Sequence, residues 1–125
     1  MALEAQKVGI NKEENNMALK REIEMENGVI LNYHRIVAVN SITNIKSIIE
    51  VASYISEKQR EKEARYIELQ LKQNRTEEDE RELEKGINVL VETKYYDMPY
   101  SEENSIENAY EYLKTLDDFK NAQDV

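Results

Sequence analysis

His34 is the only histidine of the chain and the first residue to consider for chemistry, because an imidazole can act as a general base or as a metal ligand. A Ser-His-Asp triad or a metal centre needs partner side chains that the fold brings close. The chain has no cysteine and no second histidine, so the ligand spacings typical of zinc sites are absent from the sequence. Since a lone histidine on a predicted strand is far more often a structural or surface residue, we interpret His34 in that way.

Carboxylates are the other candidate groups, and the densest run is Glu77-Glu78-Asp79-Glu80. Catalytic carboxylates need an apolar pocket or a like-charged neighbour that changes their pKa. This run lies in a stretch with the composition of a solvated segment, and it lacks the Asp-x-Asp-x-Asp-Gly pattern of a calcium loop. The three glycines, Gly9, Gly28 and Gly86, are too far apart for a phosphate-binding loop. We therefore expect no enzymatic activity, no cofactor and no metal.

Tyrosine dominates the aromatic residues, with eight Tyr, one Phe and no Trp. A tyrosine combines a large apolar ring with a polar tip, which suits protein interfaces. We expect Tyr112 and one of Tyr95 and Tyr96 to face outward. The candidate interface residues are Tyr95, Tyr96, Tyr100 and Tyr112, with an ordinary surface role as an equal alternative.

Length and charge set the broad class. The 125 residues, 40% of them hydrophobic, fit one domain with one modest core. The net charge is −9, and residues 97–125 hold eight acidic against two basic side chains. Such a balance repels phosphate and anionic lipid, so we expect no direct nucleic-acid binding and no membrane binding. No signal peptide and no apolar run of membrane-spanning length occurs, which predicts folding in a cytoplasm.

Apolar alternation predicts the strands. Period-two alternation over 18–26, Asn27-Gly28 and a β-branched run over 29–39 predict a β-hairpin, in which both turn residues must tolerate positive φ. Residues 45–56 and 87–96 predict two more strands. In the last strand we expect one face to hold Ile87, Val89, Val91, Thr93 and Tyr95. The result is a small antiparallel sheet of about four strands.

Two helical regions complete the prediction. In residues 57–86, eighteen of thirty side chains are charged, which favours an exposed helix or helical hairpin, with Thr76 as an N-cap and Gly86 as an end. Ile67, Leu69 and Leu71 alternate as in a strand, so a strand or a mobile segment is the alternative for the first half. After Pro99 breaks the last strand, Ser101 can cap a C-terminal helix. Its apolar stripe is predicted to comprise Ile106, Ala109, Tyr110, Leu113 and Leu116, with Phe119 as a final anchor after Asp117-Asp118.

The predicted organisation is a flexible N-terminal extension over 1–16 and one α+β domain over 17–125. The C-terminal helix covers one face of the sheet, and the charged helical insertion 57–86 precedes the last strand. Met1-Ala2-Leu3-Glu4 is echoed by Met17-Ala18-Leu19-Lys20, either because Met17 is an alternative start or by coincidence.

Four stretches of the chain carry a resemblance, namely Met17–Val29, Tyr33–Ile36, Ile49–Tyr54 and Ala109–Leu116. They resemble small proteins encoded among the tail and baseplate genes of phages and prophages of Gram-positive bacteria. The resemblance covers roughly 17–122 and implies a structural virion protein, made in the host cytoplasm and present in the tail in several copies. It implies homo-oligomers and contacts with other tail or baseplate proteins. The extension 1–16 and the insertion 57–86 depart from the pattern.

The acidic balance of residues 97–125 supports a second hypothesis. An acidic regulatory or DNA-mimic protein would occupy the basic surface of a nucleic-acid-binding partner. Its binding would weaken steeply as salt screens the charges.

Overall fold

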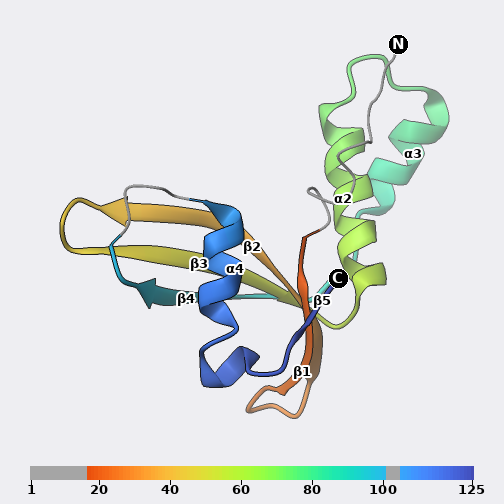
Figure 1. The fold of residues 1–125 in the computed structure, drawn as a ribbon. Helices are drawn as coiled ribbons and strands as arrows, with labels where there is room; N and C mark the ends of the chain where they lie inside the picture. Colours follow the sequence, from red (N-terminus) through yellow and green to blue (C-terminus); the bar gives the residue numbers. More distant parts are fainter. Residues whose placement is uncertain (1–16, 101–104) are drawn as a thin grey trace.

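The computed structural model describes residues 17–100 and 105–125, which form an antiparallel sheet and three α-helices (Figure 1). The sheet order is β4-β3-β2-β1-β5. The predicted α+β class is thereby confirmed. The expected extension 1–16 and the expected cap Ser101 lie outside the described residues. The strands are β1 (Leu19–Glu24), β2 (Ile30–Ile42), β3 (Lys46–Tyr54), β4 (Val91–Met98) and β5 (Gln123–Asp124); the helices are α2 (Glu57–Leu71), α3 (Glu77–Lys85), α4 (Ile106–Leu113) and the 3-10 turn η1 (Asp117–Phe119).

The predicted hairpin joins β1 to β2, but its turn differs from the expected one. Gly28 adopts a φ of 88°, whereas Asn27 has no positive φ. Instead the Asn27 side-chain oxygen accepts the Val29 N–H at 3.0 Å, and the Met25 N–H donates to the Val29 carbonyl at 2.8 Å. Asn27 thus acts through its side chain, as asparagine often does in turns, and only the glycine needs the left-handed region.

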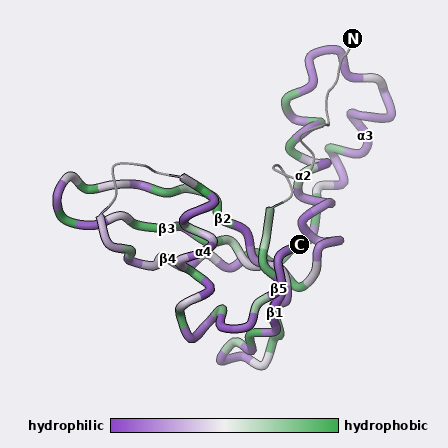
Figure 2. The backbone as a smooth tube through the Cα atoms, viewed as in Figure 1, coloured by the Kyte–Doolittle hydropathy of each residue, from purple (hydrophilic) through white to green (hydrophobic). Residues whose placement is uncertain are grey.

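The charged insertion is a helical hairpin, which confirms the helical prediction for 57–86. Thr76 and Asp79 form a capping box at the start of α3, with reciprocal bonds of 3.1 and 3.0 Å. Lys72 Nζ reaches Asp79 at 2.7 Å from the end of α2, and Gly86 ends α3 at a φ of 66°. The hairpin projects beyond one end of the sheet and is mostly hydrophilic along its length (Figures 1 and 2).

The main core lies between one face of the sheet and the C-terminal segment. α4 and η1 run across this face (Figure 1), and Phe119 is fully buried as the predicted anchor. α4 begins after Ser105, whose side chain accepts the Asn108 N–H at 3.2 Å, and ends at Leu113 rather than at Leu116. The core residues are Leu19, Ile36, Ile49, Val51, Met98, Ala109, Tyr110, Leu113 and Phe119.

The last strand is shorter than predicted, since β4 begins at Val91 and not at Ile87. Val91, Thr93 and Tyr95 share one face as predicted, but the main core lies on the other face, which carries Tyr96 and Met98. Register explains the choice, because Tyr96 lies opposite the buried Ile49 of β3. The short strand β5 was not predicted at all. Its position depends on pairing with β1, and the flanking Val125 N–H donates to the Ala18 carbonyl at 3.0 Å.

Candidate functional site

The His34 side chain is buried at the floor of a cavity between the β1–β2 hairpin and β4. Its Nδ1 lies 2.7 Å from Ser53 Oγ, and its Nε2 lies 2.7 Å from the Arg21 carbonyl oxygen. A carbonyl only accepts, so Nε2 carries the proton and Nδ1 accepts the Ser53 hydroxyl. Burial lowers the pKa of His34 below its ordinary value, and the imidazole is therefore neutral near pH 7.

The wall of this cavity carries a second polar group, centred on Asp118 in η1. Asp118 Oδ2 accepts from Tyr96 Oη at 2.7 Å and from Lys94 Nζ at 2.8 Å. The Lys94 hydrogen bond and the Tyr96 hydroxyl lower the pKa of Asp118, while burial and the Asp118 carboxylate raise the pKa of Tyr96. Lys94 Nζ also lies 5.2 Å from the centre of the Tyr96 ring. The polar groups of Asp118, Tyr96 and Lys94 are thus hydrogen-bonded to one another, and these bonds hold η1 against β4.

The cavity has a volume of about 340 Å³. Its apolar lining comes from Ile23, Met25 and Leu31, and Glu24, Glu26 and Glu92 also line it. The Ser53–His34 pair has the spacing of a nucleophile and its base. However, the described residues give His34 no carboxylate on Nε2, and the pair joins β1, β2 and β3. We therefore assign His34 a structural role, as the sequence predicted for a lone strand histidine.

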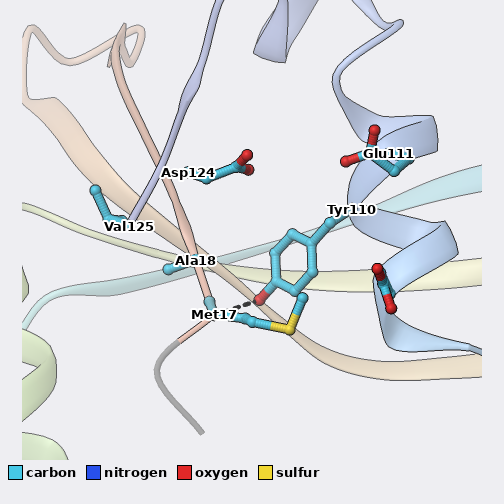
Figure 3. A pocket seen from close by; sticks show the side chains of 7 residues that line it. Met17, Ala18, Tyr110, Glu111, Asp124 and Val125 are labelled. Carbon is cyan, nitrogen blue, oxygen red and sulfur yellow. Dashed lines mark hydrogen bonds between the residues drawn. The ribbon is translucent and has the colours of Figure 1, made fainter. Parts of the chain in front are cut away.

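A second hollow, of about 260 Å³, lies where Met17 and Ala18 before β1 and the C-terminal residues meet α4 (Figure 3). Tyr110 points from α4 into it, and its hydroxyl donates to the Met17 carbonyl at 2.7 Å. Glu111 and Asp124 also line it, and Lys114 bridges them at 2.7 and 3.1 Å. Its polar groups thus largely satisfy one another, which makes it a junction of α4, β1 and β5.

The structure separates the candidate interface tyrosines. Tyr95 is 64% exposed and faces away from α4, whereas Tyr96 packs edge-on against Phe119 with ring centres 5.5 Å apart. Tyr112 was expected to face outward, but it is half-buried and packs against the main core. Tyr100 is half-buried just after Pro99. The difference arises because the even-numbered residues of β4 face the C-terminal segment, so Tyr95 alone presents a largely exposed ring.

One open feature is the outer edge of β4, here called the β4 edge (Val91–Met98). In the described residues β4 pairs only with β3, so its other side offers unpaired backbone groups along the strand. At the opposite end of the sheet, β5 is only two residues long, and β1 pairs with β2 only as far as His34. Beyond that point the Ile36 N–H of β2 is bonded to the Tyr110 hydroxyl of α4 instead of to a strand.

The sheet face away from α4 is open next to this edge. We call it the open face: Thr93, Tyr95 and Asp97 of β4, with Lys46, Ile48 and Glu50 of β3. Lys46 Nζ and Asp97 form an exposed ion pair of 3.2 Å across it. At its other end the face is covered, since Tyr33, Ala52 and Tyr54 form a second buried cluster beside α2. The part around Tyr95 is not covered by any of the described residues.

No protein-family model, curated protein or solved structure matches the chain. Among residues 17–100 and 105–125, no helix is long and apolar enough to span a membrane, and no group of three potential metal ligands occurs.

Sequence reasoning missed Ser53, Lys94 and Asp118 as parts of the His34 cavity. These residues are far apart along the chain and meet only through strand register and η1. One local signal was available: in a strand whose residues alternate between faces, Ser53 shares its face with Ile49 and Val51, so a hydroxyl there required a buried partner.

Proposed function

We propose that the chain is a non-enzymatic structural protein that acts by protein–protein assembly, with the β4 edge and the adjoining open face as its contact surface. The observation that carries this proposal is the eight-residue edge strand with no partner among the described residues. An extended segment of another chain can add to such an edge through main-chain hydrogen bonds. The exposed Tyr95 ring beside it supplies apolar area with a polar tip.

The setting of this assembly follows from the resemblance of the sequence stretches alone. It is the tail or baseplate of a phage or phage-like particle, where a structural protein is present in several copies and contacts other tail proteins. The domain's polar networks support a structural role, because His34, Tyr96 and Asp118 all have partners within the fold.

The acidic-regulator hypothesis gains less support. It needs carboxylates that are available to a basic partner. Several carboxylates of residues 97–125 instead lie in ion pairs within the domain, namely Asp97, Glu111, Asp118 and Asp124.

Sedimentation of a fluorescently labelled chain tests the assembly proposal. It is measured first with the pure protein and then in an extract of the cells that naturally produce the chain. We expect the wild type to move as a complex in at least one setting and Tyr95→Asp to move as the lone chain. Gln70→Asp is the control, because it adds the same charge at an exposed position of α2, in the helical hairpin that projects beyond the sheet (Figure 1). A wild type that moves as the lone chain in both settings would contradict the proposal. Detection of the chain in purified particles by mass spectrometry tests the tail setting separately.

A further inference from the structure

We infer that the β4 edge pairs with the β4 edge of a second copy of this chain, antiparallel and centred on Tyr95. The inference rests on the proposed function and specifies its partner. Two five-stranded sheets would then join into one continuous sheet across a two-fold axis. Self-pairing through identical edges is the isologous contact on which closed symmetric dimers depend.

The edge itself favours this kind of contact. Natural sheets protect an edge strand by shortening it, covering it, bending it away with a bulge or placing charged side chains on it. β5 shows the first device, since it is only two residues long. In the described residues β4 is neither short, bulged nor paired on its outer side: it spans Val91–Met98 and pairs with β3 without a register shift. Its only protection among these residues is charge, from Glu92, Lys94 and Asp97, so a second strand must place these side chains without repulsion. Pro99 follows the strand and limits the pairing to these residues.

Side-chain chemistry selects the register. A two-fold axis perpendicular to the sheet does not exchange the two faces of the sheet. The residue on the axis therefore lies directly opposite the same residue of the second copy. Centring on Lys94 would place two ammonium groups opposite each other, which is destabilising. Centring on Thr93 or on Tyr96 would pair only residues 91–95 or 94–98 of the strand. Centring on Tyr95 pairs residues 92–98 and sets no like charges opposite each other.

The pairs in the Tyr95-centred register are complementary on both faces. On the open face the two Tyr95 rings meet. Thr93 of each copy lies opposite Asp97 of the other copy, so the threonine hydroxyl can donate to the aspartate carboxylate. On the other face Lys94 lies opposite Tyr96, so each ammonium can contact a ring of the second copy as it does its own ring at 5.2 Å. Tyr95 is the most exposed aromatic residue of the described chain, and the pairing would cover it.

Because the chain has no cysteine, single introduced cysteines report this geometry without interference. Directly opposed residues of an antiparallel pair have Cα atoms about 4.5–5.5 Å apart, within the range of about 4.4–6.8 Å that a disulfide spans. We expect Tyr95→Cys to form a disulfide dimer under mild oxidation. Asp97→Cys lies on the same face but about 13 Å from its own copy, so it should cross-link at least about tenfold more slowly.

A mixture of Thr93→Cys and Asp97→Cys tests the same register with Tyr95 intact. The mixture should give the heterodimeric cross-link, while each variant alone should give little. All three positions are exposed, so circular dichroism should show an unchanged fold. Equal cross-linking of Asp97→Cys and Tyr95→Cys, together with no cross-link in the mixture, would overturn the inference.

The mass of the wild type in solution separates this inference from the broader proposal. A monomer at high concentration that binds another protein only when Tyr95 is intact would overturn self-pairing and leave assembly through β4 standing. A dimer that persists in Tyr95→Asp would place the contact elsewhere and overturn the inference. A wild type that is monomeric and partnerless would overturn both.

Discussion

The Tyr110 hydroxyl on α4 accepts the backbone N–H of Ile36 in β2 at 2.8 Å. This contact lies beside the bulge of β2, where the pairing with β3 changes register between Ile36 and Ala38. The same hydroxyl donates to the Met17 carbonyl at 2.7 Å, so one side chain connects α4 to β2 and to the start of β1. An aromatic residue predicted only as part of an apolar stripe thus also completes the hydrogen bonding of the sheet.

Tyr110→Phe should therefore lower the free energy of unfolding by about 1–3 kcal/mol, because the buried Ile36 N–H loses its acceptor. Tyr112→Phe is the control on the same helix, since its hydroxyl bonds to no described residue, and it should stay close to wild type. Urea unfolding followed by circular dichroism measures both. Equal midpoints for Tyr110→Phe and wild type would show that the hydroxyl is dispensable.

His34 predicts a pH dependence of stability on the acid side. Burial lowers its pKa below the ordinary value of 6.5, so folding favours the neutral ring. Its contribution is complete above pH 6.5 and is lost as the pH falls from 6.5 through the lower folded-state pKa. Denaturation midpoints between pH 7.5 and 5 should decline for wild type and change less for His34→Gln. Parallel curves for the two proteins would assign the pH dependence to other groups.

The contacts of Asp79 should stabilise the helical hairpin without contributing to the stability of the sheet. Its bonds to Lys72 and to Thr76 lower the pKa of its carboxyl to about 2. The stabilisation is complete above the ordinary pKa of 3.8 and is lost as the pH falls through about 2. At neutral pH, Thr76→Ala should cost the helix about 1 kcal/mol through loss of the N-cap. Hydrogen exchange should show faster exchange in α2 and α3 and unchanged protection in β2 and β3; a global loss would contradict this.

Val51→Asp and Val91→Asp should differ sharply. Val51 is 1% exposed in the main core, so an unpaired carboxylate there should cost about 3–5 kcal/mol. Val91 is only half-buried at the start of β4, and its substitution should cost clearly less. Thermal unfolding of the two variants compares them directly, and a smaller effect at Val51 would place the core on the wrong face of the sheet.

Local chemistry explains which parts of the fold were predictable. Gly28, Thr76 and Pro99 each act within a few residues, and each marks the turn, cap or strand end that the sequence indicated. The buried face of β4 depended on a choice between two tyrosines with identical side chains, Tyr95 and Tyr96. Cross-strand pairing with the buried Ile49 places Tyr96, and not Tyr95, on the buried face.

The candidate sites were predictable to a smaller extent. The sequence named Tyr95 for its residue type, but it could not indicate that β4 would be an edge strand, because strand order depends on pairings between distant segments. The His34 cavity was missed for the same reason, since Ser53 and Asp118 come close to His34 only after the sheet and η1 are packed.

The helical hairpin is inserted between two directly paired residues of the sheet, since Tyr54 at the end of β3 is paired with Val91 at the start of β4. A tight turn could connect those two positions without altering the strands. The strand pairing thus sets little limit on the length of what is inserted there. The first half of α2 is constrained, since Glu63 accepts the buried Tyr54 hydroxyl at 2.6 Å. An engineer can therefore lengthen the hairpin or fuse a reporter between α2 and α3, while the rest of the domain keeps its fold.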